Sequence, residues 1–178
     1  VTTYEMFDES GNFNFGSFRE KISEILKKQD RLVILFNAPA HNPTGYSPSS
    51  GTWDRIISIL KECAAPGKKI TFFLDIAYID FAGDSARERE FLRKFGDMPD
   101  NILVVVGFSA SKGFTFYGLR TGAMLCITQN EEIAQEFKRV TAYSSRGSWS
   151  NCTRAGQAAI AKVFHDEKLL ARVFEERK

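Results

Sequence analysis

Residues 102–108 are the stretch that most constrains the fold, because they form the continuous apolar run ILVVVGF. A short, unbroken run rich in β-branched residues is typical of a strand that is buried on both faces of a parallel sheet. Two similar runs occur at 32–36 and 70–74, and segments with helical periodicity lie between the runs. Strands that alternate with helices call for right-handed crossovers, so the sequence predicts a three-layer α/β/α fold with a mainly parallel sheet.

Apolar periodicity and capping residues predict the helices. They are expected at 16–29, from Ser50 as N-cap to the Pro66-Gly67 stop, at about 86–95, at 130–143 and at 151–176, with a polar loop at 144–150. The apolar run at 122–128 is expected to be a fourth strand. Because no crossover helix separates this run from the one at 102–108, an antiparallel pairing is open to it.

Composition excludes several classes of protein. With 24 basic and 22 acidic residues the net charge is +2, which gives no electrostatic footprint for nucleic acid. No apolar run approaches membrane-spanning length, so we expect a soluble protein. The three cysteines show neither CxxC nor metal-ligand spacing, which suits a reducing cytoplasm and predicts no metal. Because the chain opens on Val1 rather than Met, it can be a piece of something longer.

Polar residues follow each of the three apolar runs. Asn42 follows the first, Asp75 and Tyr78 follow the second, and Ser109 and Lys112 follow the third. Because parallel strands share one carboxyl edge, where open α/β sheets bind ligands, we expect these side chains to line one crevice. Polar residues at strand ends are also common in every α/β protein, so each of them taken alone fits a solvated loop residue equally well.

As a group, these residues suit one kind of cofactor. An aldehyde with a pyridine ring and a phosphate needs a lysine for a Schiff base, a carboxylate for the ring nitrogen, donors for the ring oxygen, and a cation and a hydroxyl for the phosphate. The chain has candidates for these roles in the same order: Lys112, Asp75, Tyr78 with Asn42, and Arg120 with Ser109.

Four motifs carry a resemblance to a known family. They are HNPTG at 41–45, DIAY at 75–78, SASK at 109–112 and YGLRTG at 117–122. With these motifs the chain resembles the fold-type I pyridoxal-phosphate (PLP) enzymes, and within them the aspartate and aromatic aminotransferases. The resemblance implies that residues 1–178 are the central and later part of the PLP-binding large domain. The small domain and the N-terminal phosphate loop of such an enzyme would then lie outside this chain.

The resemblance also implies a role for each candidate. Lys112 would form the Schiff base and move the proton between the substrate and the cofactor. Asp75 would pair with the pyridine nitrogen and keep it protonated, so that the ring accepts electrons. Tyr78 and Asn42 would donate to the ring's phenolic oxygen, with a cis peptide bond between Asn42 and Pro43. The phosphate ligands would be Arg120 and Ser109.

A fifth, weaker match concerns the substrate. RGSWSN at 146–151 resembles the family segment whose arginine reaches into the neighbouring subunit and binds the distal carboxylate of the substrate. If Arg146 holds that place, the substrate is dicarboxylic and the protein is a homodimer. A solvated loop arginine is the alternative.

The function implied is amino transfer between a dicarboxylic or aromatic amino acid and a 2-oxo acid, in cytoplasmic amino-acid metabolism. The 178-residue chain alone is expected to be inactive or nearly so, because the family's arginine for the α-carboxylate lies in the small domain. A PLP-dependent lyase or decarboxylase of the same fold is an alternative, since the cofactor supports all these reactions. A non-catalytic relative is another, although such proteins usually lose the lysine or the aspartate that Lys112 and Asp75 match.

Overall fold

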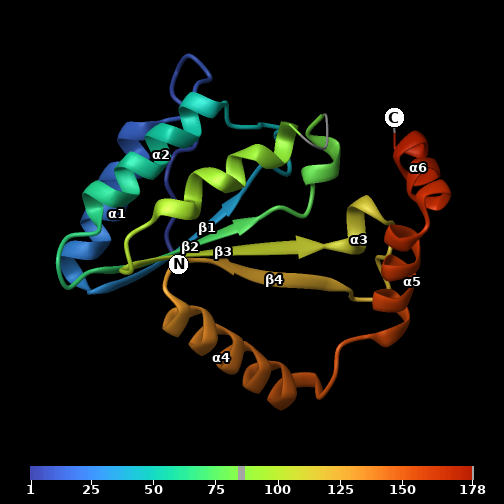
Figure 1. Ribbon diagram of the computed structural model, residues 1–178. Coiled ribbons are helices and arrows are strands. Elements are labelled where there is room, and N and C mark those ends of the chain that lie inside the picture. Colours follow the sequence, from blue (N-terminus) through green and yellow to red (C-terminus); the bar gives the residue numbers. More distant parts are fainter. Residues whose placement is uncertain (84–86, 178) are drawn as a thin grey trace.

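The computed structural model describes residues 1–83 and 87–177, and this part of the chain forms a four-stranded sheet (Figure 1). The strands lie in the order β1 (Arg31–Asn37), β2 (Lys69–Asp75), β3 (Ile102–Ser109) and β4 (Gly122–Ile127). β1, β2 and β3 are parallel, whereas β4 pairs with β3 in the antiparallel direction. The predicted mainly parallel sheet is confirmed, and the first three apolar runs lie inside β1, β2 and β3.

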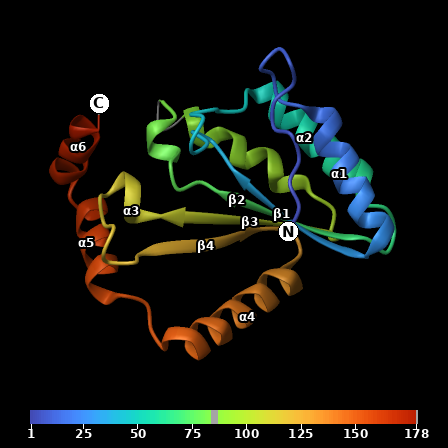
Figure 2. The same cartoon turned by 180° about the vertical axis from the view of Figure 1, so that it is seen from behind.

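Helices lie on both sides of the sheet, as predicted. One side carries α1 (Phe15–Lys28), α2 (Ser50–Cys63) and the 3-10 helix η2 (Arg87–Asp97), and the other carries α4 (Glu131–Trp149). Figure 2 shows the same separation from behind. Two helices, α5 (Arg154–His165) and α6 (Glu167–Glu176), lie beyond the end of the sheet at which β3 stops. None of the helices in the described ranges is long and apolar enough to span a bilayer.

The core lies between the sheet and the helices α1, α2 and η2. Alternate strand residues such as Phe36, Phe72 and Val104 point into it and are at most 2% exposed. On the opposite face, Val33 and Leu35 are 69% and 68% exposed, so α4 covers only part of that face. The site described below lies at the carboxyl edge of this half-covered sheet.

We expect Phe72→Ala to destabilise the fold severely. The ring is fully buried and lies 5.5 Å from the Phe36 ring and 5.8 Å from the Phe95 ring, centroid to centroid. Truncating a buried phenylalanine removes apolar contacts and leaves a cavity, which costs about 3–5 kcal/mol of unfolding free energy. Urea denaturation measures the change, and Val33→Ala is the control, expected to shift stability by about 0.5 kcal/mol or less. Equal losses in the two variants would contradict this view of the core.

The first two helices are each capped by a side chain that bonds a backbone amide three residues further along the chain. Asn14 accepts from the Ser17 amide at the start of α1, and Ser49 accepts from the Thr52 amide at the start of α2. The predicted N-cap, Ser50, is wrong by one residue, because the hydroxyl of Ser49 is the one within reach of the amide.

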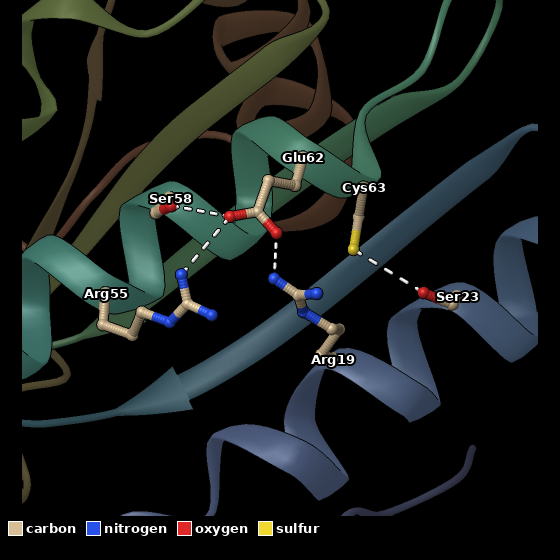
Figure 3. Close-up of polar contacts among 6 residues, drawn as sticks. All are labelled: Arg19, Ser23, Arg55, Ser58, Glu62 and Cys63. Atoms are coloured by element: carbon tan, nitrogen blue, oxygen red, sulfur yellow. Dashed lines mark hydrogen bonds and ion pairs between the residues drawn. The ribbon is translucent and has the colours of Figure 1, made fainter.

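Figure 3 shows polar contacts within α2 and between α1 and α2. The carboxylate of Glu62 accepts from Ser58 at 2.7 Å, from Arg55 at 3.4 Å and from Arg19 across the helix pair. The hydrogen bond from Ser58, with the charges of Arg19 and Arg55, lowers the pKa of the Glu62 carboxyl. All three charged side chains are more than 40% exposed, so solvent screens the network and it contributes little stability.

The end of α4 differs from the sequence prediction. The segment expected as a polar loop, 144–150, is helical up to Trp149, where α4 ends. The indole Nε1 of Trp149 donates to the hydroxyl of Ser145 at 3.1 Å, one turn earlier. This contact lies along one helix face, where residues four apart are neighbours.

The C-terminal helix is broken rather than continuous, so the prediction of one helix over 151–176 is wrong. Asp166 accepts from the amides of Lys168 and Leu169 and so caps α6 where α5 has just ended. An aspartate that bonds the backbone in this way competes with helix continuation. The charged helix expected at 86–95 is the 3-10 helix η2, and its first expected residue, Ala86, lies outside the described residues.

Candidate active site

The candidate site lies at the carboxyl ends of the three parallel strands. The register aligns Asn37 of β1 with Asp75 of β2, and Asp75 with Gly107 of β3. Open α/β sheets bind ligands at this edge. The strand ends and the loops after them carry six residues, which we call the strand-end cluster: Asn42, Asp75, Tyr78, Ser109, Lys112 and Arg120.

Asn42 and Tyr78 meet directly. The amide Nδ2 of Asn42 donates to the hydroxyl of Tyr78 at 3.1 Å, across the loops that follow β1 and β2. The predicted cis peptide bond between Asn42 and Pro43 is present, and the Ala38–Pro39 bond is cis as well. The amide and the phenol therefore form one pair of hydrogen-bond donors at a single point of the edge.

Lys112 lies next to this pair. It belongs to the short helix α3 (Ala110–Gly113), which begins where β3 ends. Its Nζ lies 5.5 Å from the centroid of the Tyr78 ring and 5.0 Å from that of Tyr117, within the range of a cation–π contact. The side chain is half-buried, so the amine is held beside two rings but open to a ligand.

Asp75 provides a carboxylate at the same edge. Its Oδ1 accepts from the backbone amide of Ala77 at 3.1 Å, which fixes the carboxyl group at the end of β2. Leu74 points into the core, so Asp75 lies on the opposite face of the strand. Within the ranges described, no cation lies at ion-pair distance from Asp75, so the carboxylate has capacity for a cationic ligand.

Arg120 and Ser109 are linked through Ser111. Arg120 Nη1 donates to the backbone oxygen of Tyr117 at 3.0 Å and to Ser111 Oγ at 3.4 Å, and the Ser111 amide donates to Ser109 Oγ at 3.2 Å. Arg120 has a φ of +47°, a left-handed conformation that costs a side-chain-bearing residue about 1 kcal/mol or more. Among the described side chains, none of the acidic ones forms an ion pair with this guanidinium. An uncompensated guanidinium beside a hydroxyl suits an anion.

Asn37 supports the site and was missed by the sequence analysis. Its Nδ2 donates to the Asp75 carbonyl at 3.2 Å, while its Oδ1 accepts from the Asn42 amide at 2.8 Å. The side chain of Asn37 thus connects the backbone of the Asn42 loop to the end of β2. The signal was available, because Asn37 is a polar residue directly after a buried apolar run, like the candidates that were chosen.

Arg146 lies apart from the strand-end cluster in its contacts. It is exposed in the last turn of α4, and its Nη1 donates to Ser150 Oγ at 2.5 Å. Within the described residues it has no hydrogen bond or ion pair to the cluster. The structure therefore brings Asn42, Tyr78 and Lys112 into proximity, holds Asp75, Ser109 and Arg120 at the same edge, and leaves Arg146 outside.

The chain is similar in sequence to proteins of known function. The chain is 30% identical over 143 residues to the cytoplasmic aspartate aminotransferase of Caenorhabditis elegans, an alignment that covers 80% of this chain and 33% of that protein. It is 28% identical over 171 residues to the aromatic-amino-acid aminotransferase of Escherichia coli K12, covering 96% of this chain and 41% of the relative. The chain thus spans well under half the length of these relatives.

Solved structures share the fold. An aminotransferase from Anaerococcus prevotii DSM 20548 superimposes with a TM-score of 0.93 at 41% identity, over 99% of this chain and 43% of that one. An aromatic-amino-acid aminotransferase from Burkholderia pseudomallei, solved covalently bound to pyridoxal phosphate, superimposes with a TM-score of 0.82 at 26% identity, over 99% and 42% of the two chains. The family model for aminotransferase class I and II matches residues 1–178. The resemblance predicted from the four motifs is confirmed, and the chain belongs to the class I and II aminotransferase family.

Proposed function

We propose that the intact protein is a PLP-dependent aminotransferase that moves an amino group between an amino acid and a 2-oxo acid. The observation that carries this proposal is the position of the Lys112 amine, beside the Tyr78 ring whose hydroxyl accepts from Asn42. Family membership supports it. The activity is a proposal because the chain spans only 33–43% of the relatives described above.

The chemistry of the strand-end cluster fits PLP. Asp75 offers a carboxylate without a cationic partner in the described chain, which suits a protonated ring nitrogen. Asn42 and Tyr78 offer donors to a phenolic oxygen, and Arg120 with Ser109 offers a cation and a hydroxyl to a phosphate. Bound there, PLP would supply an electron sink for the bond being broken at the α carbon of the substrate.

The residues of the chain would do the remaining work. The amine of Lys112 would hold PLP covalently until the amino group of the substrate displaces it, and the freed amine would then move a proton from the α carbon of the substrate to the cofactor, as a positioned general base and acid. Asp75 would keep the ring nitrogen charged throughout, because a carboxylate favours the protonated partner. Tyr78 and Asn42 would hold the orientation of the ring relative to Lys112 Nζ.

We further propose that the substrate is a dicarboxylic or aromatic amino acid and that the protein is a cytoplasmic homodimer. The relatives named for aspartate and aromatic amino acids support the substrate class. Arg146 would bind the distal carboxylate in the neighbouring subunit, and its exposed position at the end of α4 is compatible with an intersubunit role.

Covalent labelling tests the cofactor assignment. PLP is added to the intact protein, the complex is reduced with borohydride, and the modified peptide is identified by mass spectrometry. We expect one dominant adduct, on Lys112, because its amine lies beside the Tyr78 ring and the guanidinium of Arg120 lies on the same side of the sheet as a partner for the phosphate. The matched control is pyridoxal, which lacks the phosphate that Arg120 and Ser109 would bind and should label weakly. Labelling scattered over surface lysines with both reagents would overturn the assignment.

A further inference from the structure

A buried carboxylate lies under the turn that carries Lys112. It belongs to Asp80 of the 3-10 helix η1 (Ile79–Phe81), two residues after Tyr78, and its side chain is only 3% exposed. Its Oδ1 lies 2.6 Å from Arg89 Nη2 and 3.2 Å from Arg177 Nη1. Two guanidinium groups therefore share one oxygen of this buried carboxyl group.

The second carboxylate oxygen of Asp80, Oδ2, packs against the backbone of Gly113, the residue after Lys112. A Cβ atom built on Gly113 would lie 2.0 Å from Asp80 Oδ2 and 2.9 Å from Cγ, far inside contact distance. Gly113 is the residue directly after Lys112, so the carboxyl group of Asp80 packs on the turn itself. With Asp80 in place, no residue other than glycine fits at this position.

Arg177 holds the same turn from the C-terminal end of the chain. Its Nε donates to the carbonyl of Gly113 at 2.8 Å, across 64 residues of sequence. Its guanidinium carbon lies 4.5 Å from the centroid of the Phe114 ring, and its side chain is 13% exposed. The segment that ends α6 is thereby attached to the residues on the C-terminal side of Lys112.

The hydrogen bonding among these three side chains is incomplete, which a role in stability alone does not explain. Arg89 and Arg177 share one oxygen of Asp80, and Arg177 Nη2 is buried with no hydrogen-bond partner in the described part of the chain. Buried polar groups without a partner are rare and costly. What the arrangement does achieve is a connection between the segment after Tyr78, the Lys112 turn and the end of α6.

We propose that Asp80 and Arg177 form a strut that fixes Lys112 Nζ in its place beside the Tyr78 ring, which makes both of them positioning residues for amino transfer. The inference rests on the proposed function for its catalytic consequence, but not for the geometry. A displacement of about 1 Å at a reacting group can cost about a hundredfold in rate. The strut would therefore act on turnover through Lys112, without contact to the substrate or to the phosphate site at Arg120.

Two substitutions test the strut. Asp80→Asn keeps the shape of the side chain and removes its charge. Arg177→Lys keeps the charge at α6, removes the Nε donor to Gly113, and leaves Asp80 its contact with Arg89. We expect each to lower kcat by about 10- to 100-fold with KM within about threefold of the unchanged protein. The matched control is Glu176→Gln, which breaks the exposed Arg172–Glu176 pair on the same helix and should leave kcat unchanged.

A second readout needs no PLP. Competitive acetylation of the cofactor-free protein, followed by mass spectrometry, reports the accessibility of each lysine. We expect Lys112 to be labelled at least about threefold faster in both variants, because its turn opens locally. Lys68, paired with Asp30 far from the strut, should be labelled at an unchanged rate, which separates local opening from general unfolding.

The outcomes separate the two proposals. If Asp80→Asn does not fold, the Arg177→Lys variant alone decides. Unchanged Lys112 acetylation and unchanged kcat in the folded variants would overturn the strut, and so would equal acceleration at Lys68 and Lys112. Failure of the unchanged protein to form the PLP adduct on Lys112 would overturn the proposed function, while the acetylation result would still decide whether the strut holds this lysine.

Discussion

Replacing Lys112 by alanine should abolish amino transfer by the intact protein, with an expected fall in kcat of about 10⁴-fold or more. The change removes both the amine that would attach PLP and the group that would carry the α proton. It leaves Asn42, Asp75 and Arg120 in place, so PLP should still bind through its ring and its phosphate. Turnover is measured with aspartate, tyrosine and phenylalanine as amino donors and 2-oxoglutarate as acceptor.

Two controls sharpen this prediction. Lys112→Arg keeps a positive charge beside Tyr78 but removes the nucleophilic amine, so it should lose turnover to the same extent. Lys94→Ala removes a lysine that pairs with Asp54 between η2 and α2, and it should keep full activity. Turnover by Lys112→Ala within about tenfold of the unchanged protein would contradict the role of this residue.

The strands and their common edge were predictable because their signals are local. A short continuous apolar run such as 102–108, rich in β-branched residues, is typical of a buried strand, and the side chain that follows it then lies at the carboxyl end of the sheet. Asp75 and Lys112 follow from that rule, and Asn37 would have followed had it been applied to the first strand without exception. The antiparallel direction of β4 was left open by the sequence and is fixed by pairing with β3.

The helix ends after β4 were not predictable by the same means. The polar segment 144–150 was predicted to be a loop, yet α4 continues through it as far as Trp149. Asp166 was predicted to lie within one continuous helix, yet its carboxylate caps the start of α6. In both places the local sequence allows two conformations, and periodicity alone does not choose between them.

The strut was beyond the reach of sequence analysis for a different reason. Asp80, Arg89 and Arg177 are ordinary charged residues, and nothing in their spacing indicates that they meet. Their convergence depends on where α6 lies relative to the Lys112 turn, which is a matter of tertiary packing. Gly113 reflects that packing, but its role is apparent only from the structure, where a Cβ atom at this position would clash with Asp80 Oδ2.

The second large effect is expected at Asp75. In the intact protein, Asp75→Ala should still form the reduced PLP adduct on Lys112, because neither the amine nor the donors at Asn42 and Tyr78 are changed. Turnover should nevertheless fall by about 10²- to 10³-fold, which is what removing a preorganised charge-stabilising group costs.

The separation of the two steps is what makes Asp75 diagnostic. If the carboxylate of Asp75 only held β2 together, removing it would lower both the stability of the protein and the labelling of Lys112. If it keeps the ring nitrogen protonated, removing it lowers turnover alone. Asp75→Asn is the matched variant: its Oδ1 can still accept from the Ala77 amide, so the strand end is preserved while the charge is lost. If Asp75→Asn and Asp75→Ala both keep ordinary turnover, the ring nitrogen is not paired here; if both lose it with Lys112 still labelled, the charge of Asp75 is what the reaction requires.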